Sequence, residues 1–169
     1  MDEQFHTYFN EVPCYLSVHD ADYRIVEANR RFRNDFGERI GESCFQVYKQ
    51  RAEVCPDCPV EKTFADGASH SSEQVLTTRH GRQTPVMVHT TPIVDQQGRI
   101  VSVMEMHTDI TKVKDLEEKL SQSRERLARL FEMVPCFLTV QGPDLVIQNA
   151  NRSFRETFGP AFRRGRETR

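Results

Sequence analysis

Apolar and polar positions alternate along the first two thirds of the chain, and turn-forming residues separate the segments. Val, Ile, Met and Thr are frequent in the segments expected to be strands. Asn29 is placed to cap a short helix in which Phe32 and Phe36 have an i,i+4 spacing, and Gly37 is placed to end it. The pattern predicts two strands, three helices and three strands, in this order: 14–18, 24–27, 30–36, 42–49, 59–67, 72–78, 84–93 and 100–108.

The last two predicted strands are joined by the turn at 95–98, which favours a hairpin. A symmetric register places Met87, His89, Met104 and Met106 on one face of the sheet. Val88, Thr90, Val103 and Glu105 then share the opposite face. Packing is the expected role of the methionines, since Met fills irregular apolar gaps. The pattern leaves open which face lines the interior.

Residues 131–159 repeat residues 9–37 without a gap, and about half of the positions are identical. Self-similarity over this length indicates one structural unit used twice. The second copy matches only the first third of the unit, so we expect one complete domain followed by the start of another. Cys14 and Cys136 occupy equivalent positions, which favours a packing role for both.

The element order resembles that of the PAS domain, a sensory module of bacterial histidine kinases, cyclic-dinucleotide enzymes and transcription regulators. The resemblance covers residues 9–111. It is carried by Val26-Glu27-Ala28-Asn29 with Phe32 and Phe36, by the turn at 95–98, and by Asp109-Ile110-Thr111 after the last strand. It implies an α+β fold, in which short helices cover one face of a five-stranded antiparallel sheet and leave a small pocket. Such domains bind ligands or cofactors, or only dimerise.

The segment after this domain has apolar residues at alternating steps of three and four, which is the pattern of a coiled-coil seam. The seam consists of Val113, Leu116, Leu120, Leu127 and Leu130, with Ser123 at one seam position and Val134 at the end. The other positions are mostly charged, so two chains could pair along the seam. A lone helix packed on its own domain is the alternative. The predicted organisation is an N-terminal amphipathic helix (1–12), a PAS domain (13–111), a coiled-coil signalling helix (112–134) and an incomplete second PAS repeat (135–169).

Composition excludes several classes of protein. The N-terminal stretch lacks the basic and apolar regions of a secretory signal, and no apolar run is long enough to span a membrane. We therefore expect a cytoplasmic location. The net charge of −2 gives no general attraction to nucleic acid. Catalytic signatures are also missing, so the chain is expected to be a regulatory module whose effector domain belongs to the same polypeptide.

Candidate chemistry lies in three cysteines. Cys55 and Cys58 form a Cys-Pro-Asp-Cys-Pro turn, and Cys44 lies nearby in the sequence. Three thiolates could bind zinc or iron with a fourth ligand, which could be Cys14, His70, His80 or Asp57 or could come from outside the protein. A reversible disulfide between Cys55 and Cys58, with Cys44 as the resolving thiol, is a second possibility, and inert thiols are a third. The helix expected to start at Pro59 should lower the pKa of the adjacent thiol.

The known cofactors of PAS domains do not fit the residues present. Light-sensing flavin domains have a cysteine where Cys44 lies, but their Asn, Arg and Gln pattern is missing around it. The third predicted helix lacks the histidine of haem-binding relatives, and Pro59 replaces the histidine of a covalent haem motif. Neither flavin nor haem is expected.

The resulting hypothesis is a sensory module that detects a redox, metal or small-molecule signal near Cys44, Cys55 and Cys58. Asp109, Ile110 and Thr111 would transmit the signal into the helix at 112–134, which pairs in a homodimer. A ligand-free dimerisation module is the alternative. A thiol oxidoreductase is the third hypothesis, although its motif belongs in a βαβ setting.

Overall fold

The computed structural model describes residues 3–159, with the side chains of Glu3 and Phe5 left aside. The chain divides into two units, Met1–Val113 and Lys114–Arg169. Each unit is treated below by itself. Residues 160–169, the end of the predicted second repeat, lie outside the described part.

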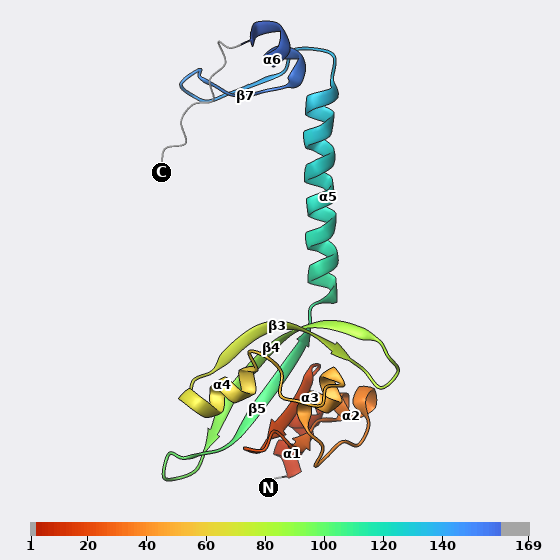
Figure 1. Cartoon of the computed structure of the whole chain (residues 1–169), viewed down its shortest axis with the longest axis vertical. Helices are drawn as coiled ribbons and strands as arrows, with labels where there is room; N and C mark the ends of the chain where they lie inside the picture. The colour runs from red at the N-terminus through yellow and green to blue at the C-terminus, as the bar shows by residue number, and fades with distance from the viewer. Residues whose placement is uncertain (1–2, 160–169) are drawn as a thin grey trace. The chain divides into compact units, whose positions relative to one another are not determined.

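The first unit is built on a five-stranded sheet in the order β2-β1-β5-β4-β3, with every neighbouring pair antiparallel (Figure 1). Its strands are β1 (Tyr15–His19), β2 (Ile25–Ala28), β3 (His70–Thr77), β4 (Gln83–Val94) and β5 (Ile100–Asp109). All five strands were predicted from the sequence, with bounds that differ by one or two residues. β5, the last strand of this sheet in chain order, lies in its centre, between β1 and β4.

Four helices accompany this sheet: α1 (Glu3–Glu11), α2 (Arg30–Phe36), α3 (Cys44–Lys49) and α4 (Pro59–Asp66). Asn29 caps α2, because its side chain accepts a hydrogen bond from the backbone N–H of Phe32. The φ of Gly37 is +89°, which suits glycine and ends the helix. Pro59 occupies the first turn of α4, as expected from its fixed φ.

The two faces of the sheet carry different cores. On the inner face, Tyr15, Phe32, Phe36 and Tyr48 pack with Val86 and Val88 in one buried cluster. On the outer face, Phe9 of α1 packs with Cys14, Leu16, Met104 and Met106. Met104 and Met106 therefore have the packing role expected for them, and α1 has an apolar contact for its amphipathic face.

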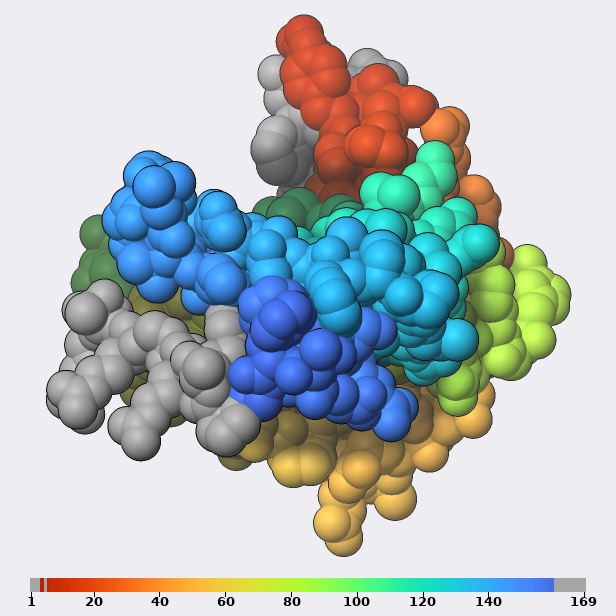
Figure 2. Space-filling view, turned by 90° about the horizontal axis from the view of Figure 1, so that it is seen from above, coloured from red at the N-terminus to blue at the C-terminus, as the bar shows by residue number. Residues whose placement is uncertain are grey.

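Helix α5 (Thr111–Met133) follows β5. It has no buried residue, and its seam residues Val113, Leu116, Leu120, Leu127 and Leu130 are all more than half exposed. Figure 2, in which α5 runs from cyan-green to light blue, shows its side chains at the surface. Within residues 3–159 no helix is long and apolar enough to cross a membrane.

Beyond α5, the second unit contains β6 (Thr139–Gln141), β7 (Ile147–Ala150) and α6 (Arg152–Phe158). β6 and β7 form an antiparallel pair, and Asn151 caps α6 through the N–H of Phe154. These elements follow the same order as β1, β2 and α2.

Candidate functional site

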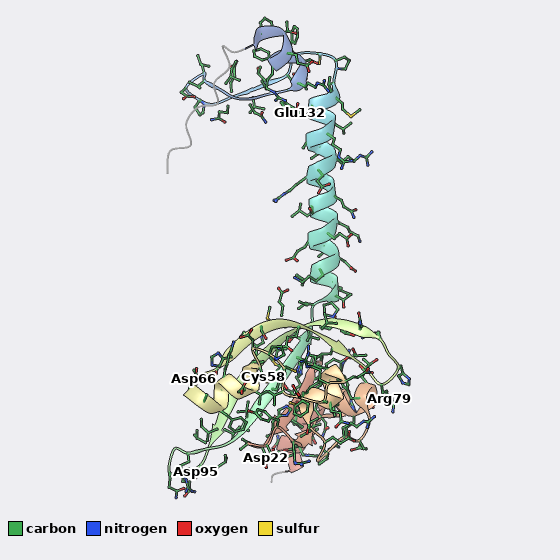
Figure 3. The ribbon with its side chains drawn as sticks, in the orientation of Figure 1. Asp22, Cys58, Asp66, Arg79, Asp95 and Glu132 are labelled. Atoms are coloured by element: carbon green, nitrogen blue, oxygen red, sulfur yellow. The ribbon has the colours of Figure 1, made fainter. Side chains whose placement is uncertain are left out.

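The inner face of the sheet lines a small enclosed pocket beneath α3 and α4. Cys44, Cys55 and Cys58 are among the lining residues, so thiols from two segments of the chain border one pocket. Cys58, labelled in Figure 3, lies at the start of α4. The remaining lining comes from the helices and the sheet: Phe45, Tyr48, Lys49, Pro59, Val60, Gln74, Leu76, Glu105 and His107. Its free volume is only about 20 Å³, enough for one water-sized molecule.

The face with Val88, Thr90, Val103 and Glu105 is thus the one that faces the interior. The register pairs Thr90 with Glu105 and Val88 with His107, and all of these residues are buried. The outer face, with Met104 and Met106, packs against α1 instead. Only the position of the helices determines which face of the sheet lines the pocket.

A buried charged network forms the floor of the pocket, and the sequence hypothesis did not include it. Glu105 on β5 lies between two histidines: His19 Nε2 is 3.0 Å from Glu105 Oε2, and His107 Nε2 is 3.4 Å from Glu105 Oε1. Ser17 Oγ lies 2.9 Å from His19 Nε2 and 2.7 Å from the hydroxyl of Tyr48. The alternation of β1 and β5 placed these residues on one face, but nothing in the pattern distinguished a buried His from an exposed one.

The electrostatics of Glu105 follow from its neighbours. Burial by itself raises the pKa of a carboxyl group, but the ionic interactions with His107 and His19 outweigh it. The pKa of Glu105 consequently lies well below its usual range, and the carboxylate is ionised. A carboxylate that is 5% exposed needs such partners, because an unpaired buried charge is strongly destabilising.

Three atoms of this network have no hydrogen-bond partner within the described residues: Glu105 Oε2, His19 Nδ1 and His107 Nδ1. His19 Nε2 is close to Glu105 Oε2, but the approach lacks the geometry of a hydrogen bond. Buried polar atoms are nearly always paired in native proteins. Unpaired atoms at the floor of a pocket therefore make this a candidate site for a polar molecule, water included.

Burial is the largest influence on the pKa values of the three thiols. Burial raises the pKa of Cys44, and the Glu105 carboxylate raises it further. Burial also raises the pKa of Cys58, although the N–H groups of Glu61 and Val60 at the start of α4 act in the opposite direction. The prediction that the helix start lowers this pKa was wrong, because loss of hydration outweighs the helix. Burial likewise raises the pKa of Cys55.

The candidate fourth metal ligands lie elsewhere. Cys14 packs on the outer face of the sheet, His70 Nε2 pairs with Asp66 at 2.9 Å, and Asp57 pairs with Lys62 at 3.3 Å. His80 Nε2 instead accepts a hydrogen bond from Arg79. Across residues 3–159, no three or more His, Cys, Asp or Glu side chains are grouped as metal ligands. The described geometry gives no support to a zinc or iron site at the cysteines.

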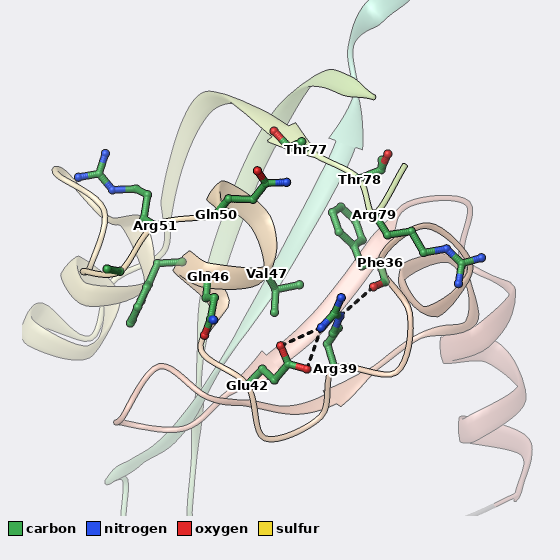
Figure 4. A pocket seen from close by; sticks show the side chains of 12 residues that line it. Phe36, Arg39, Glu42, Gln46, Val47, Gln50, Arg51, Thr77, Thr78 and Arg79 are labelled. Carbon is green, nitrogen blue, oxygen red and sulfur yellow. Dashed lines mark hydrogen bonds and ion pairs between the residues drawn. The ribbon is translucent and has the colours of Figure 1, made fainter. Parts of the chain in front are cut away.

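A larger hollow lies on the open surface beside α3 (Figure 4). It has a volume of about 730 Å³ and includes Arg39, Arg51 and Arg79. Arg39 is already paired with both carboxylate oxygens of Glu42, at 3.1 and 3.2 Å, and Arg51 and Arg79 extend away on opposite sides. The charges do not converge on one point, so we regard the enclosed pocket as the candidate site.

The pocket connects directly to the chain segment that leaves the domain. Glu105, His107 and Asp109 are alternate residues of β5, and Ile110 leads into α5. Asp109 Oδ1 accepts hydrogen bonds from the backbone N–H of Thr111 at 2.9 Å and from its hydroxyl at 2.6 Å. Arg82 Nη2 lies 3.8 Å from Asp109 Oδ2, and Ile110 N–H donates to the carbonyl of Pro85. Burial acts to raise the pKa of Asp109, but the bonds from Thr111 and the charge of Arg82 lower it overall.

Comparison with known proteins agrees with this architecture. The model of the PAS fold family matches residues 9–115, which is more than half of the chain, so the chain belongs to this family. The fold and the pocket are typical of the sensory modules in this family. No curated protein sequence matches the chain.

Solved structures share the fold at low sequence identity. VqmA bound to DPO is 19% identical with a TM-score of 0.55, over 64% of this chain and 57% of VqmA. An RNA-binding light-oxygen-voltage receptor is 16% identical with a TM-score of 0.61, over 75% of this chain and 37% of the receptor. The PAS domain of an HTR-like protein from Haloarcula marismortui is 21% identical with a TM-score of 0.52, over 63% and 89%. The chain thus spans little more than half of VqmA and about a third of the receptor.

Proposed function

We propose that this chain is the sensory part of a multidomain signalling protein, such as a histidine kinase, a diguanylate cyclase or a transcription regulator. A small molecule binds in the enclosed pocket and changes the strand that continues into α5. The role is regulatory, and any catalytic output belongs to an effector domain of the same polypeptide. The membership of the PAS family and the fold shared with VqmA and a light-oxygen-voltage receptor support a sensory role.

One observation carries the proposal: the unpaired polar atoms of the pocket lie on β5, the strand that continues into α5. Glu105 and His107 provide two of the three unpaired atoms, and Asp109 follows two residues later. A ligand that moves β5 therefore acts on the Asp109-Ile110-Thr111 junction through continuous backbone. The ligand must prefer one arrangement of the junction over another, because equal affinity for both shifts nothing.

The output is a change in the pairing of α5 in a homodimer. Five exposed apolar side chains lie along α5 at heptad spacing, and a second copy of the helix would bury them. VqmA is described as a dimer, which is consistent with this arrangement but is a property of that protein. The repeat beyond α5 is proposed to begin a second PAS domain, for which the same cap and strand pair support the assignment.

The Asp109→Ala variant of the full chain tests the transmission step. Loss of both bonds to Thr111 should abolish the ligand-dependent change in hydrogen exchange at the start of α5, while ligand binding stays within about twofold. Asp115→Ala, on the exposed side of α5, is the matched control. If Asp109→Ala responds to ligand as the wild type does, this junction does not transmit the signal.

A ligand-free spacer is the second candidate function, favoured by the small free volume of the pocket. It predicts that α5 pairs in the same way whatever occupies the pocket. Full downstream regulation in a Cys55→Ser, Cys58→Ser double variant of the whole receptor would support the spacer. The raised pKa values of the thiols disfavour a thiol oxidoreductase, since the protonated thiol is a poor nucleophile.

A further inference from the structure

The pocket has a donor and acceptor pattern that selects among classes of ligand. We infer that it binds a small uncharged molecule that donates hydrogen bonds, such as a primary amide, a urea or a heteroaromatic ring with an N–H or O–H group. This inference rests on the proposed sensory function and assigns the ligand class to the same pocket.

Glu105 supplies the first part of the pattern. An ionised carboxylate only accepts hydrogen bonds, and Glu105 Oε2 has no hydrogen-bond partner within the described residues. The complementary ligand group is therefore an N–H or O–H donor. Glu105 is almost completely buried, so the ligand must place this donor in the pocket itself.

His107 supplies the second part. Its Nε2 lies 3.4 Å from Glu105 Oε1, and its Nδ1 has no partner in the described part of the chain. A primary amide carries both N–H donors and a C=O acceptor, so it can pair with Glu105 Oε2 and with this ring nitrogen whether or not Nδ1 carries a proton.

Charge excludes the two ionic alternatives. An anion would approach the ionised Glu105 in a site shielded from water, where like charges repel strongly. A cation would approach the positively charged side chain of Lys49, which lines the pocket and whose Nζ donates to the carbonyl of Val75 at 2.6 Å. The protonated thiols of Cys44, Cys55 and Cys58 add no charge of either sign, and they provide a weakly polar wall with Phe45, Val60 and Leu76.

Size and access limit the ligand further. Lys49, Cys55 and Gln74 line both the enclosed pocket and a surface groove of about 380 Å³ that includes Pro56 and Asp57. These three side chains therefore stand between the groove and the floor of the pocket. The Cys-Pro-Asp-Cys segment must therefore move before a molecule larger than one water can enter the pocket.

Three probes of nearly identical shape test the inference: acetamide, acetate and acetamidinium. Each is titrated into the full chain, and long-range ¹H–¹⁵N spectra follow the ring nitrogens of His107. Acetamide should perturb Nδ1 at a concentration about tenfold lower than either ion requires. Glu105→Gln should weaken acetamide about tenfold, since the variant loses the charged acceptor, whereas Glu117→Gln on α5 should leave it unchanged.

His107→Gln, followed through the ring nitrogens of His19 beside Glu105, provides a second variant in case Glu105→Gln does not fold, and circular dichroism checks both. Tighter binding of acetate or acetamidinium overturns the ligand class while the sensory function stands. No perturbation by any probe also overturns it. Acetamide binding at His107 that leaves hydrogen exchange in α5 unchanged upholds the ligand class and contradicts the sensory function.

Discussion

The two copies of the repeat share their hydrogen bonds but differ in burial. In the first copy, Asn29 Oδ1 accepts from the N–H groups of Leu16 and Phe32, and Nδ2 donates to the carbonyls of Cys14 and Val12. In the second copy, Asn151 makes the same four bonds, with Leu138, Phe154, Cys136 and Val134. Each asparagine ties the end of a preceding helix to a strand pair and to the next helix.

The apolar side chains around these asparagines have different surroundings. Tyr15 and Phe36 are 1% and 2% exposed, whereas the equivalent Phe137 and Phe158 are 54% and 51% exposed. Phe36 packs against Tyr15, Phe32 and Tyr48, while Phe158 contacts only Phe137 and Phe154 among the described aromatic residues. In the part of the chain that the structure describes, β6 pairs with β7 alone.

The difference teaches which interactions are local. The asparagine bonds join residues less than 20 positions apart, so they form wherever the short sequence occurs. Burial of the aromatic residues instead requires Tyr48 of α3, Leu76 of β3 and Val86 and Val88 of β4, which lie outside the repeated segment. The local bonds define the shape of the unit, and the distant elements provide most of its stability.

The largest difference should come from the paired variants Phe36→Ala and Phe158→Ala in the full chain. Removing the buried ring of Phe36 should lower the free energy of unfolding of the first unit by about 3–5 kcal/mol. Removing Phe158 should change it by less than about 0.5 kcal/mol. Urea denaturation followed by circular dichroism measures both, and equal effects would contradict the comparison.

The effects of Asn29→Ala and Asn151→Ala on the free energy of unfolding should differ less than those of the two phenylalanine variants. Asn29 is completely buried, and its loss leaves backbone groups of Leu16 and Cys14 unpaired, at a cost of about 2–4 kcal/mol. Asn151→Ala should leave the main transition unchanged and increase hydrogen exchange at Leu138 and Phe154. A main transition that shifts equally in both variants would show that the two units unfold together.

The buried carboxylate should make the first unit sensitive to acid. The folded chain depresses the pKa of Glu105, so its contribution to stability is complete above the unfolded pKa of about 4.3 and is lost as the pH falls below it. Glu105→Gln should reduce the slope of unfolding free energy below pH 4 by about 1.4 kcal/mol per pH unit. Urea denaturation between pH 3 and pH 6 gives the slope, and an unchanged slope in the variant would contradict the assignment.

The smallest effect is expected at the end of α5. Glu132 pairs with Arg155 at 2.6 Å, and the hydrogen bond from Arg155 lowers the pKa of this carboxyl group. Glu132→Gln should leave the unfolding transition unchanged and increase hydrogen exchange only in α6, because exposed ion pairs contribute little. Glu125→Gln is the control, because it removes an ion pair with Arg129 that lies nearer the start of α5. Equal exchange in both variants would show that the Glu132 pair does not hold α6.

Much of the fold could be predicted from the sequence. The strands and helices of the first unit, the Asn29 cap and the turn at 95–98 all follow from periodicity and turn chemistry, and the structure confirms them. The grouping of Cys44, Cys55 and Cys58 was also predicted, and they do line one pocket. The sequence could not decide among a metal site, a disulfide and inert thiols, because the pKa of a thiol depends on how far neighbouring segments exclude water.

The polar floor of the pocket shows most clearly what could not be predicted from the sequence. Sequence periodicity placed Thr90 and Glu105 on one face of the sheet, and the register confirms it. It could not show that this face is the buried one, or that His19 and His107 meet Glu105 there. Alternation along a strand has a period of two residues and treats both faces alike. Only the packing of α3 and α4 on one side and α1 on the other made Glu105 a buried charge, because burial is a property of segments brought together from distant parts of the chain.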